Sequence, residues 1–211
     1  DRPRGRGKKL QYTPVKEKAL ELGIEVFQPD NINSSDSIEK LKSISPDFII
    51  VAAFGQILKR EVLDIPKYGC INVHASLLPK YRGAAPINWA IINGETETGI
   101  TIMEMEEGLD TGDMISKRSI PIVDEVDCES IHDKLAYLGS DLLVETIDDI
   151  VKGRAKKTPQ NHNVSSYAPM IYKKTGKIHW NNKAKDINNL VRGLKPWPMA
   201  YTNYKDEVVK I

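Results

Sequence analysis

An apolar run at residues 48–54 most constrains the fold, because neither face of the segment is polar. Its sequence, Phe-Ile-Ile-Val-Ala-Ala-Phe, is typical of a central strand in a parallel sheet that helices cover on both sides. Strand and helix patterns alternate along residues 11–152, as in α/β domains. We therefore predict an α/β fold with a mainly parallel sheet and helices on both faces.

The remaining elements are predicted from apolar spacing and from the residues that start and stop helices. In the second helix, we expect Asp36 and Glu39 to provide the N-terminal cap. The predicted strands are 24–28, 48–54, 70–74, 99–106, 114–122 and one from residue 199 towards the end. The predicted helices are 14–22, 36–44, 57–64, 86–93, 129–151 and 186–194.

The strand at residues 70–74 places two polar side chains at its end. Asn72 and His74 share one face, because alternate residues of a strand point to the same side. The strand opens into residues 76–83, which have no helical or strand period and contain Pro79. Open α/β sheets bind ligands at such strand ends. The sequence therefore predicts a ligand site here.

Asp110 is the third candidate, in the connection between strands 99–106 and 114–122. A carboxylate beside an imidazole can orient the ring, and an amide can donate to an oxygen that gains negative charge. Together with Asn72 and His74, this set suits the attack of an amine on an acyl carbon. A structural role for a polar pair on a strand is the commoner alternative, although a neighbouring ordered loop favours function.

Metal and nucleophile chemistry have weaker support. The four histidines have no metal-ligand spacing, and Ser76 does not lie in a Gly-x-Ser-x-Gly motif. We expect no metal site, and we expect both cysteines to be reduced and structural. The residues concerned are His74, His132, His162 and His179, and Cys70 and Cys128.

Positive charge is concentrated at the N-terminus, although the whole chain has a formal net charge of +1. Residues 1–10 contain Arg2, Arg4, Arg6, Lys8 and Lys9 without an apolar period, which predicts a mobile basic loop. Clustered Arg and Lys suit phosphate contacts with a nucleic acid, and a solvated tail is an equal alternative. We expect Trp197 to pack at a domain joint, with base stacking as the alternative.

Three segments are predicted from composition: an N-terminal domain at 1–152, a linker at 153–177 and a second unit at 178–211 that is too short for its own core.

No apolar run is long enough to span a bilayer, and no charged-then-apolar leader opens the chain, which favours the cytoplasm. The chain starts without Met and ends inside a predicted strand, so we expect a fragment that lacks both termini.

Residues 72–83 and 99–112 resemble the signature region of the folate-dependent formyltransferase family. Segments 1–10, 53–58 and 196–200 resemble the members that act on aminoacyl-tRNA, so the resemblance covers essentially the whole chain. It implies a Rossmann-like formyltransferase domain followed by the start of an OB-like β-barrel that binds tRNA. The family begins with a strand and a Gly-rich turn, which we expect to be missing here.

The resemblance also implies an activity and its residues. Asn72, His74 and Asp110 would be catalytic, and Ser76, Leu77, Leu78 and Pro79 would line the site for 10-formyltetrahydrofolate. The basic residues of the first loop, Arg6 above all, would meet the acceptor end of initiator tRNA. The reaction would be formylation of the α-amino group of methionyl-tRNA for translation initiation, without a metal, by a monomer.

Two other interpretations remain open. A sister formyltransferase could act on an amino sugar nucleotide or on glycinamide ribonucleotide, but the basic arm favours tRNA over a small acceptor. A non-catalytic RNA-binding module would bind with a steep salt dependence and would not need His74.

Overall fold

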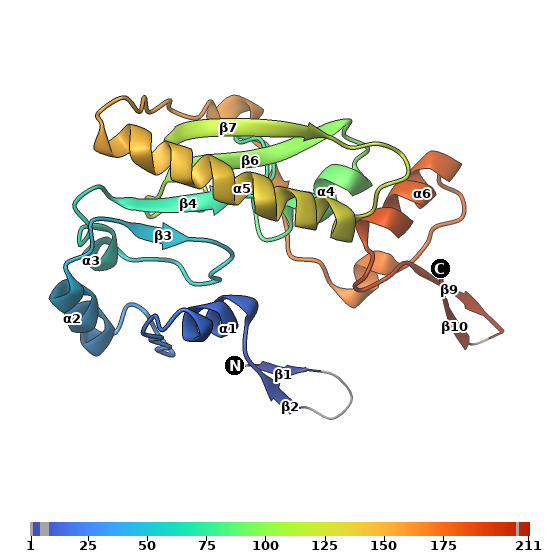
Figure 1. The fold of residues 1–211 in the computed structure, drawn as a ribbon. Helices are drawn as coiled ribbons and strands as arrows, with labels where there is room; N and C mark the ends of the chain where they lie inside the picture. Colours follow the sequence, from blue (N-terminus) through green and yellow to red (C-terminus); the bar gives the residue numbers. More distant parts are fainter. Residues whose placement is uncertain (1, 5–8, 206) are drawn as a thin grey trace.

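The computed structural model describes residues 2–4, 9–205 and 207–211 (Figure 1). Its main sheet has four strands in the order β3-β4-β6-β7. They are β3 (Ile49–Val51), β4 (Cys70–His74), β6 (Glu97–Glu104) and β7 (Met114–Pro121). The α/β class is confirmed, and the sheet is mixed rather than mainly parallel: β3 and β4 are parallel, and the other two pairings are antiparallel. The connection at 105–113 is shorter than the roughly dozen residues of a parallel crossover, so β6 and β7 form an antiparallel pair.

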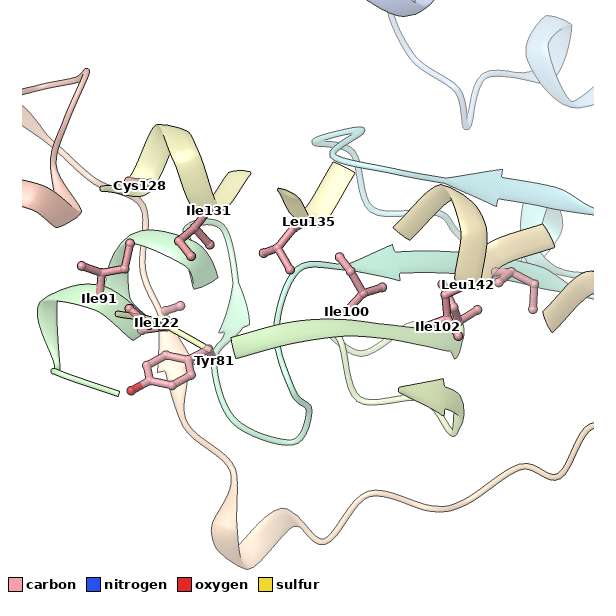
Figure 2. Close-up of a cluster of buried hydrophobic side chains, with 12 residues drawn as sticks. Tyr81, Ile91, Ile100, Ile102, Ile122, Cys128, Ile131, Leu135 and Leu142 are labelled. Carbon is pink, nitrogen blue, oxygen red and sulfur yellow. The ribbon is translucent and has the colours of Figure 1, made fainter. Parts of the chain in front are cut away.

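Helices cover both faces of this sheet, as predicted. The long helix α5 (Cys128–Val151) lies across β6 and β7, and its apolar side packs on theirs (Figures 1 and 2). The short helix α3 (Arg60–Leu63) packs with Cys70 on the other face. The residues buried between α5 and the sheet include Ile71, Ile100, Ile102, Ile131, Leu135 and Leu142.

Two predictions about strands are wrong. Strand β3 is three residues long and lies at the edge of the described sheet rather than at its centre, with Ile50 39% exposed. Residues 24–28 form no strand among the described residues. The N–H of Ile24 donates to the carbonyl of Ala19, which closes helix α1 (Pro14–Glu21) instead of joining a ladder. An apolar segment becomes a strand only where a neighbour pairs with its backbone.

The basic N-terminal segment was predicted to have no regular structure, which is wrong for its described parts. Strands β1 (Arg2–Arg4) and β2 (Lys9–Gln11) pair antiparallel, with Pro3 opposite Leu10. Backbone pairing needs no apolar period, so composition could not reveal it. Arg6 and Lys8 lie outside the described residues.

Helix α2 (Ser35–Ile44) begins at a different cap from the one predicted. The Ser34 hydroxyl accepts a hydrogen bond from the N–H of Ser37 at 3.3 Å. Ser34 therefore provides the cap that was expected from Asp36 and Glu39, and Asp36 instead lies in the first helical turn, where a negative charge is favourable.

The segment predicted to be a linker is ordered against the first domain. It contains the 3₁₀ turns η1 (His162–Val164) and η2 (Lys173–Gly176), and strand β8 (Tyr167–Ala168), which pairs in parallel with β5 (Arg82–Gly83). A region with the composition of a linker thus supplies a strand next to the predicted ligand loop.

The C-terminal part packs on the first domain. Helix α6 (Ala184–Gly193) lies against α4 (Pro86–Ile92), and Leu194 and Ile171 bury their side chains there with Ala85. The chain then forms a hairpin of β9 (Tyr201–Tyr204) and β10 (Glu207–Lys210), where one strand was predicted. In the described part of the chain, no helix has the length and apolar character needed to cross a membrane.

Candidate active site

Strand β4 provides the first two candidate residues. Its alternation is as predicted: Ile71 and Val73 join the core under α5, and Asn72 and His74 point to the opposite face. His74 is only 5% exposed and Asn72 is partly buried. The buried core on one side therefore fixes the position of two polar side chains on the other.

Asp110 meets both of them from the 105–113 connection. The Asn72 Nδ2 donates to Asp110 Oδ1 at 3.3 Å, and His74 Nδ1 lies 3.6 Å from Asp110 Oδ2. The N–H of Gly83 also donates to Oδ2, at 2.8 Å. The structure thus brings together the three residues predicted to be catalytic, although Asp110 lies 38 positions after Asn72.

The second ring nitrogen of His74 is also engaged. His74 Nε2 lies 2.9 Å from the carbonyl oxygen of Tyr81, so each ring nitrogen faces an oxygen acceptor. Tyr81 is itself held, because its hydroxyl donates to Glu95 Oε1 and accepts from Asn93. Burial raises the pKa of Tyr81 to about 12, which keeps the hydroxyl protonated near neutral pH. The imidazole is therefore fixed in one orientation.

This arrangement can stabilise a developing negative charge. The Asn72 amide carries two N–H protons, of which one donates to Asp110 and the other is available to an oxygen of a reactant. Donors held in place before the reaction are the main source of such stabilisation. Asn72, His74 and Asp110 form the polar cluster of this site. The Asp110 side chain is 13% exposed, so the polar cluster is partly shielded from water and still reachable by a reactant.

Only two of the four side chains predicted to line the folate site are accessible to a ligand. Ser76 and Leu78 are buried: the Ser76 hydroxyl donates to the carbonyl of Lys80, and Leu78 packs with two methionines. Leu77 and Pro79 are partly exposed. A ligand on this loop would therefore contact the side chains of Leu77 and Pro79 and the backbone of the other two residues. The role of the loop remains a prediction.

One supporting residue, Gln160, was missed from the sequence. Gln160 is 5% exposed, and its Nε2 donates to the carbonyl oxygens of Asp110 and Gly112. Its Oε1 accepts from Arg82 Nε and Nη2. Gln160 lies in the segment interpreted as a linker. Its partners are two backbone carbonyls and the Arg82 side chain, all at least 48 positions away in sequence, so no spacing pattern marks it.

The other histidines and both cysteines lie apart from this cluster. His132 is exposed beside Asp133, and His162 Nδ1 lies 3.3 Å from Arg82. The thiols are free and buried, and burial raises the pKa to about 12 for Cys70 and about 11 for Cys128. The two thiols are therefore suited to packing rather than to nucleophilic attack, as predicted.

Trp197 is 56% exposed, so its predicted packing at the domain joint is wrong. It lies between two prolines after α6, and Leu194 fills the apolar space against α4 instead. An exposed indole is available for stacking.

A hollow lies elsewhere on the molecule. It has a volume of about 540 Å³ and is lined in part by Leu63, Gly69, Glu104 and Ile150. Gly69 precedes β4, whereas His74 ends that strand, so the hollow lies at the other end of β4 from the cluster. Its lining residues include none of the predicted catalytic or folate residues. We therefore assign the chemistry to the polar cluster and not to this hollow.

Comparison with protein-family models decides the family. The model described as formyl transferase matches residues 1–147, and the model described as formyl transferase, C-terminal domain, matches residues 170–211. The chain belongs to the formyl transferase family. The expected family membership is therefore confirmed. The first matched range of this formyl transferase contains the polar cluster. Gln160 lies between the two matched ranges and belongs to neither.

Curated relatives are similar to this formyl transferase along its full length. Those named methionyl-tRNA formyltransferase in Clostridium acetobutylicum and Clostridioides difficile are 58% and 54% identical. Each match covers 100% of this chain and 68% of the relative.

Solved structures share the fold. A sugar N-formyltransferase from a Shewanella species has a TM-score of 0.75 at 23% identity, over 92% of this chain and 78% of that one. HypX from Aquifex aeolicus, in complex with tetrahydrofolic acid, has a TM-score of 0.70 at 22% identity, over 82% of this formyl transferase and 30% of HypX.

Proposed function

We propose that this formyl transferase moves a formyl group from 10-formyltetrahydrofolate to the α-amino group of initiator methionyl-tRNA. The observation that carries the proposal is the identity of 51–58% to relatives named methionyl-tRNA formyltransferase over the whole chain. The sugar N-formyltransferase shares the fold at 23% identity, which gives an amino sugar acceptor much less support. We also propose that the protein works in the cytoplasm as a monomer.

In the proposed reaction, the acceptor nitrogen bonds to the formyl carbon, the bond from that carbon to the folate nitrogen breaks, and one proton passes from the amine to the folate nitrogen. Asn72 would hydrogen-bond the formyl oxygen as it gains negative charge. His74 would do so through Nδ1, which lies 3.6 Å from Asp110 Oδ2 and is not tightly hydrogen-bonded to it, whereas Nε2 bonds the carbonyl of Tyr81. Asp110 would orient both side chains and assist the proton transfer. Its contacts to Asn72 Nδ2 and the Gly83 N–H support this role.

The loop at residues 76–79 is proposed to hold the folate. Leu77 and Pro79 present apolar edges that a flat ring system can pack against, next to the end of β4. The Leu78 carbonyl accepts from Lys117 Nζ at 3.2 Å, which helps to hold the loop in place.

The tRNA is proposed to bind through the basic N-terminal segment and the C-terminal part. Arg2, Arg4, Arg6, Lys8 and Lys9 give this segment the charge that phosphate binding requires. The division into domains at 1–152, 153–177 and 178–211 also remains a proposal.

Acceptor choice tests the proposal. We expect the intact protein to transfer labelled formyl from 10-formyltetrahydrofolate to methionyl-tRNA and not to an amino sugar nucleotide or glycinamide ribonucleotide. Methionyl-tRNA with an acetylated α-amine is the control, because it keeps every phosphate and lacks only the nucleophile. Label found only in the sugar or the ribonucleotide would contradict the proposal, as would tRNA binding without transfer.

A further inference from the structure

Gln160 connects the 105–113 connection, which contains Asp110, to the neighbouring strand β5. Its Nε2 donates to the carbonyl oxygen of Asp110 at 2.9 Å and to that of Gly112 at 2.8 Å. Its Oε1 accepts from Arg82 Nε at 3.0 Å and from Arg82 Nη2 at 2.7 Å. One buried amide thus binds the 105–113 connection with its nitrogen and strand β5 with its oxygen.

Gly83, which follows Arg82 in β5, forms a second link between this strand and Asp110. The N–H of Gly83 donates to Asp110 Oδ2 at 2.8 Å. Asp110 is therefore held at its backbone carbonyl through Gln160 and Arg82, and at its carboxylate through Gly83. Movement of β5 relative to the 105–113 connection would break hydrogen bonds at both points.

The backbone of Asp110 needs such support. Asp110 has φ of +51°, in the left-handed region that L-residues occupy at an energetic cost. A residue keeps such a conformation when its surroundings over-determine it. The two bonds from Gln160 reach the carbonyl of Asp110 itself and the carbonyl of Gly112, two residues later.

We propose that Gln160 is a positioning residue that holds Asp110 in the orientation required for formyl transfer. This inference rests on the proposed function, because it requires the Asp110 carboxylate to act in the reaction. Gln160 itself is buried behind Asp110 and contacts the reaction only through it.

The test is Gln160→Glu in the intact protein. The carboxylate can still pair with Arg82, but it cannot donate to the carbonyls of Asp110 and Gly112. We expect kcat for methionyl-tRNA to fall by about 10-fold to 100-fold, since small misplacements of reacting groups have effects of this size. KM should change little, because Gln160 does not bind the substrate. Gln160→Met, which adds no charge, should show the same pattern.

Asn189→Asp is the matched control. Asn189 is also a buried amide whose oxygen accepts from an arginine, Arg192 Nε and Nη2, but it lies on α6 away from Asp110. Asn189 is 3% exposed, so it does not contribute to any tRNA-binding surface of the C-terminal part. We therefore expect this variant to change the free energy of unfolding without lowering kcat. An equal loss of kcat in Asn189→Asp and Gln160→Glu would overturn the inference, as would normal kcat in both Gln160 variants.

A double variant separates positioning from general destabilisation. If Gln160 acts through Asp110, adding Gln160→Glu to Asp110→Asn should lower kcat no further than Asp110→Asn alone. A full additional loss would overturn the inference. Normal activity of Asp110→Asn alone would instead contradict the catalytic role proposed for Asp110, and absence of transfer to methionyl-tRNA in the wild type would contradict the proposed function, so these failures can be told apart.

Discussion

Replacing Asp110 with asparagine is expected to slow formyl transfer by about 10²-fold to 10⁴-fold, the usual range for a group that assists proton transfer. Asparagine has the same shape and tolerates the left-handed backbone at φ +51°. It can still accept from the N–H of Gly83. It removes the charge 3.6 Å from His74 Nδ1 and the second acceptor oxygen, which bonds Asn72 Nδ2, so the loss should come from the site rather than from folding. Single-turnover transfer to methionyl-tRNA measures the rate of the chemical step.

Asp133→Asn provides the control for this variant. Asp133 also lies beside a histidine, at 3.1 Å from His132 Nδ1, but the pair is exposed on α5. We expect Asp133→Asn to transfer formyl at the wild-type rate. Near-normal turnover in Asp110→Asn would refute the catalytic assignment, provided that its unfolding midpoint equals that of the wild type.

Replacing Gly112 with alanine is expected to damage both the fold and the site. An alanine Cβ at this position would lie 2.1 Å from the carbonyl oxygen of Glu104, and backbone at the end of β6 cannot move aside easily. Overpacking of this kind costs about 1–3 kcal/mol of unfolding free energy. The carbonyl of Gly112 also accepts from Gln160, so the shift should reach Asp110 and lower the transfer rate by about 10²-fold. Denaturant unfolding and single-turnover transfer measure the two effects.

Gly23→Ala separates these effects from ordinary backbone strain. Gly23 has φ of +68°, and a Cβ added there would have no neighbouring atom within 4 Å. Alanine there should cost about 1–2 kcal/mol through its left-handed conformation and leave transfer unchanged. If Gly112→Ala lowers the transfer rate no more than Gly23→Ala does, the close approach at Gly112 does not support the site.

The local pattern of β4 was sufficient to place Asn72 and His74. A period of two determines which side chains share a face, and the apolar residues between them identify the buried side. The same kind of pattern identified α5 and the β6–β7 pair. Asp110 was grouped with Asn72 and His74 because the chemistry of the three side chains is complementary, and no local period supports that grouping, since 38 residues separate Asp110 from Asn72.

Three of the failures share one cause, which is that pairing and hydrogen bonding between distant segments leave no local pattern. Residues 24–28 are apolar enough for a strand but have no paired neighbour in the described part of the chain. The N-terminal basic segment forms β1 and β2 through backbone pairing alone. Gln160 reaches Asp110 across 50 positions, from a segment whose composition indicated only a linker.

The location of the bound folate tests the central assignment most directly. The measurement is a crystal structure of the intact protein with a stable analogue of 10-formyltetrahydrofolate. We expect the analogue to lie along residues 76–79, with its formyl oxygen within hydrogen-bond reach, about 2.6–3.2 Å, of Asn72 Nδ2. An analogue bound in the hollow beside Gly69 and Ile150, away from Asn72 and His74, would contradict the assignment.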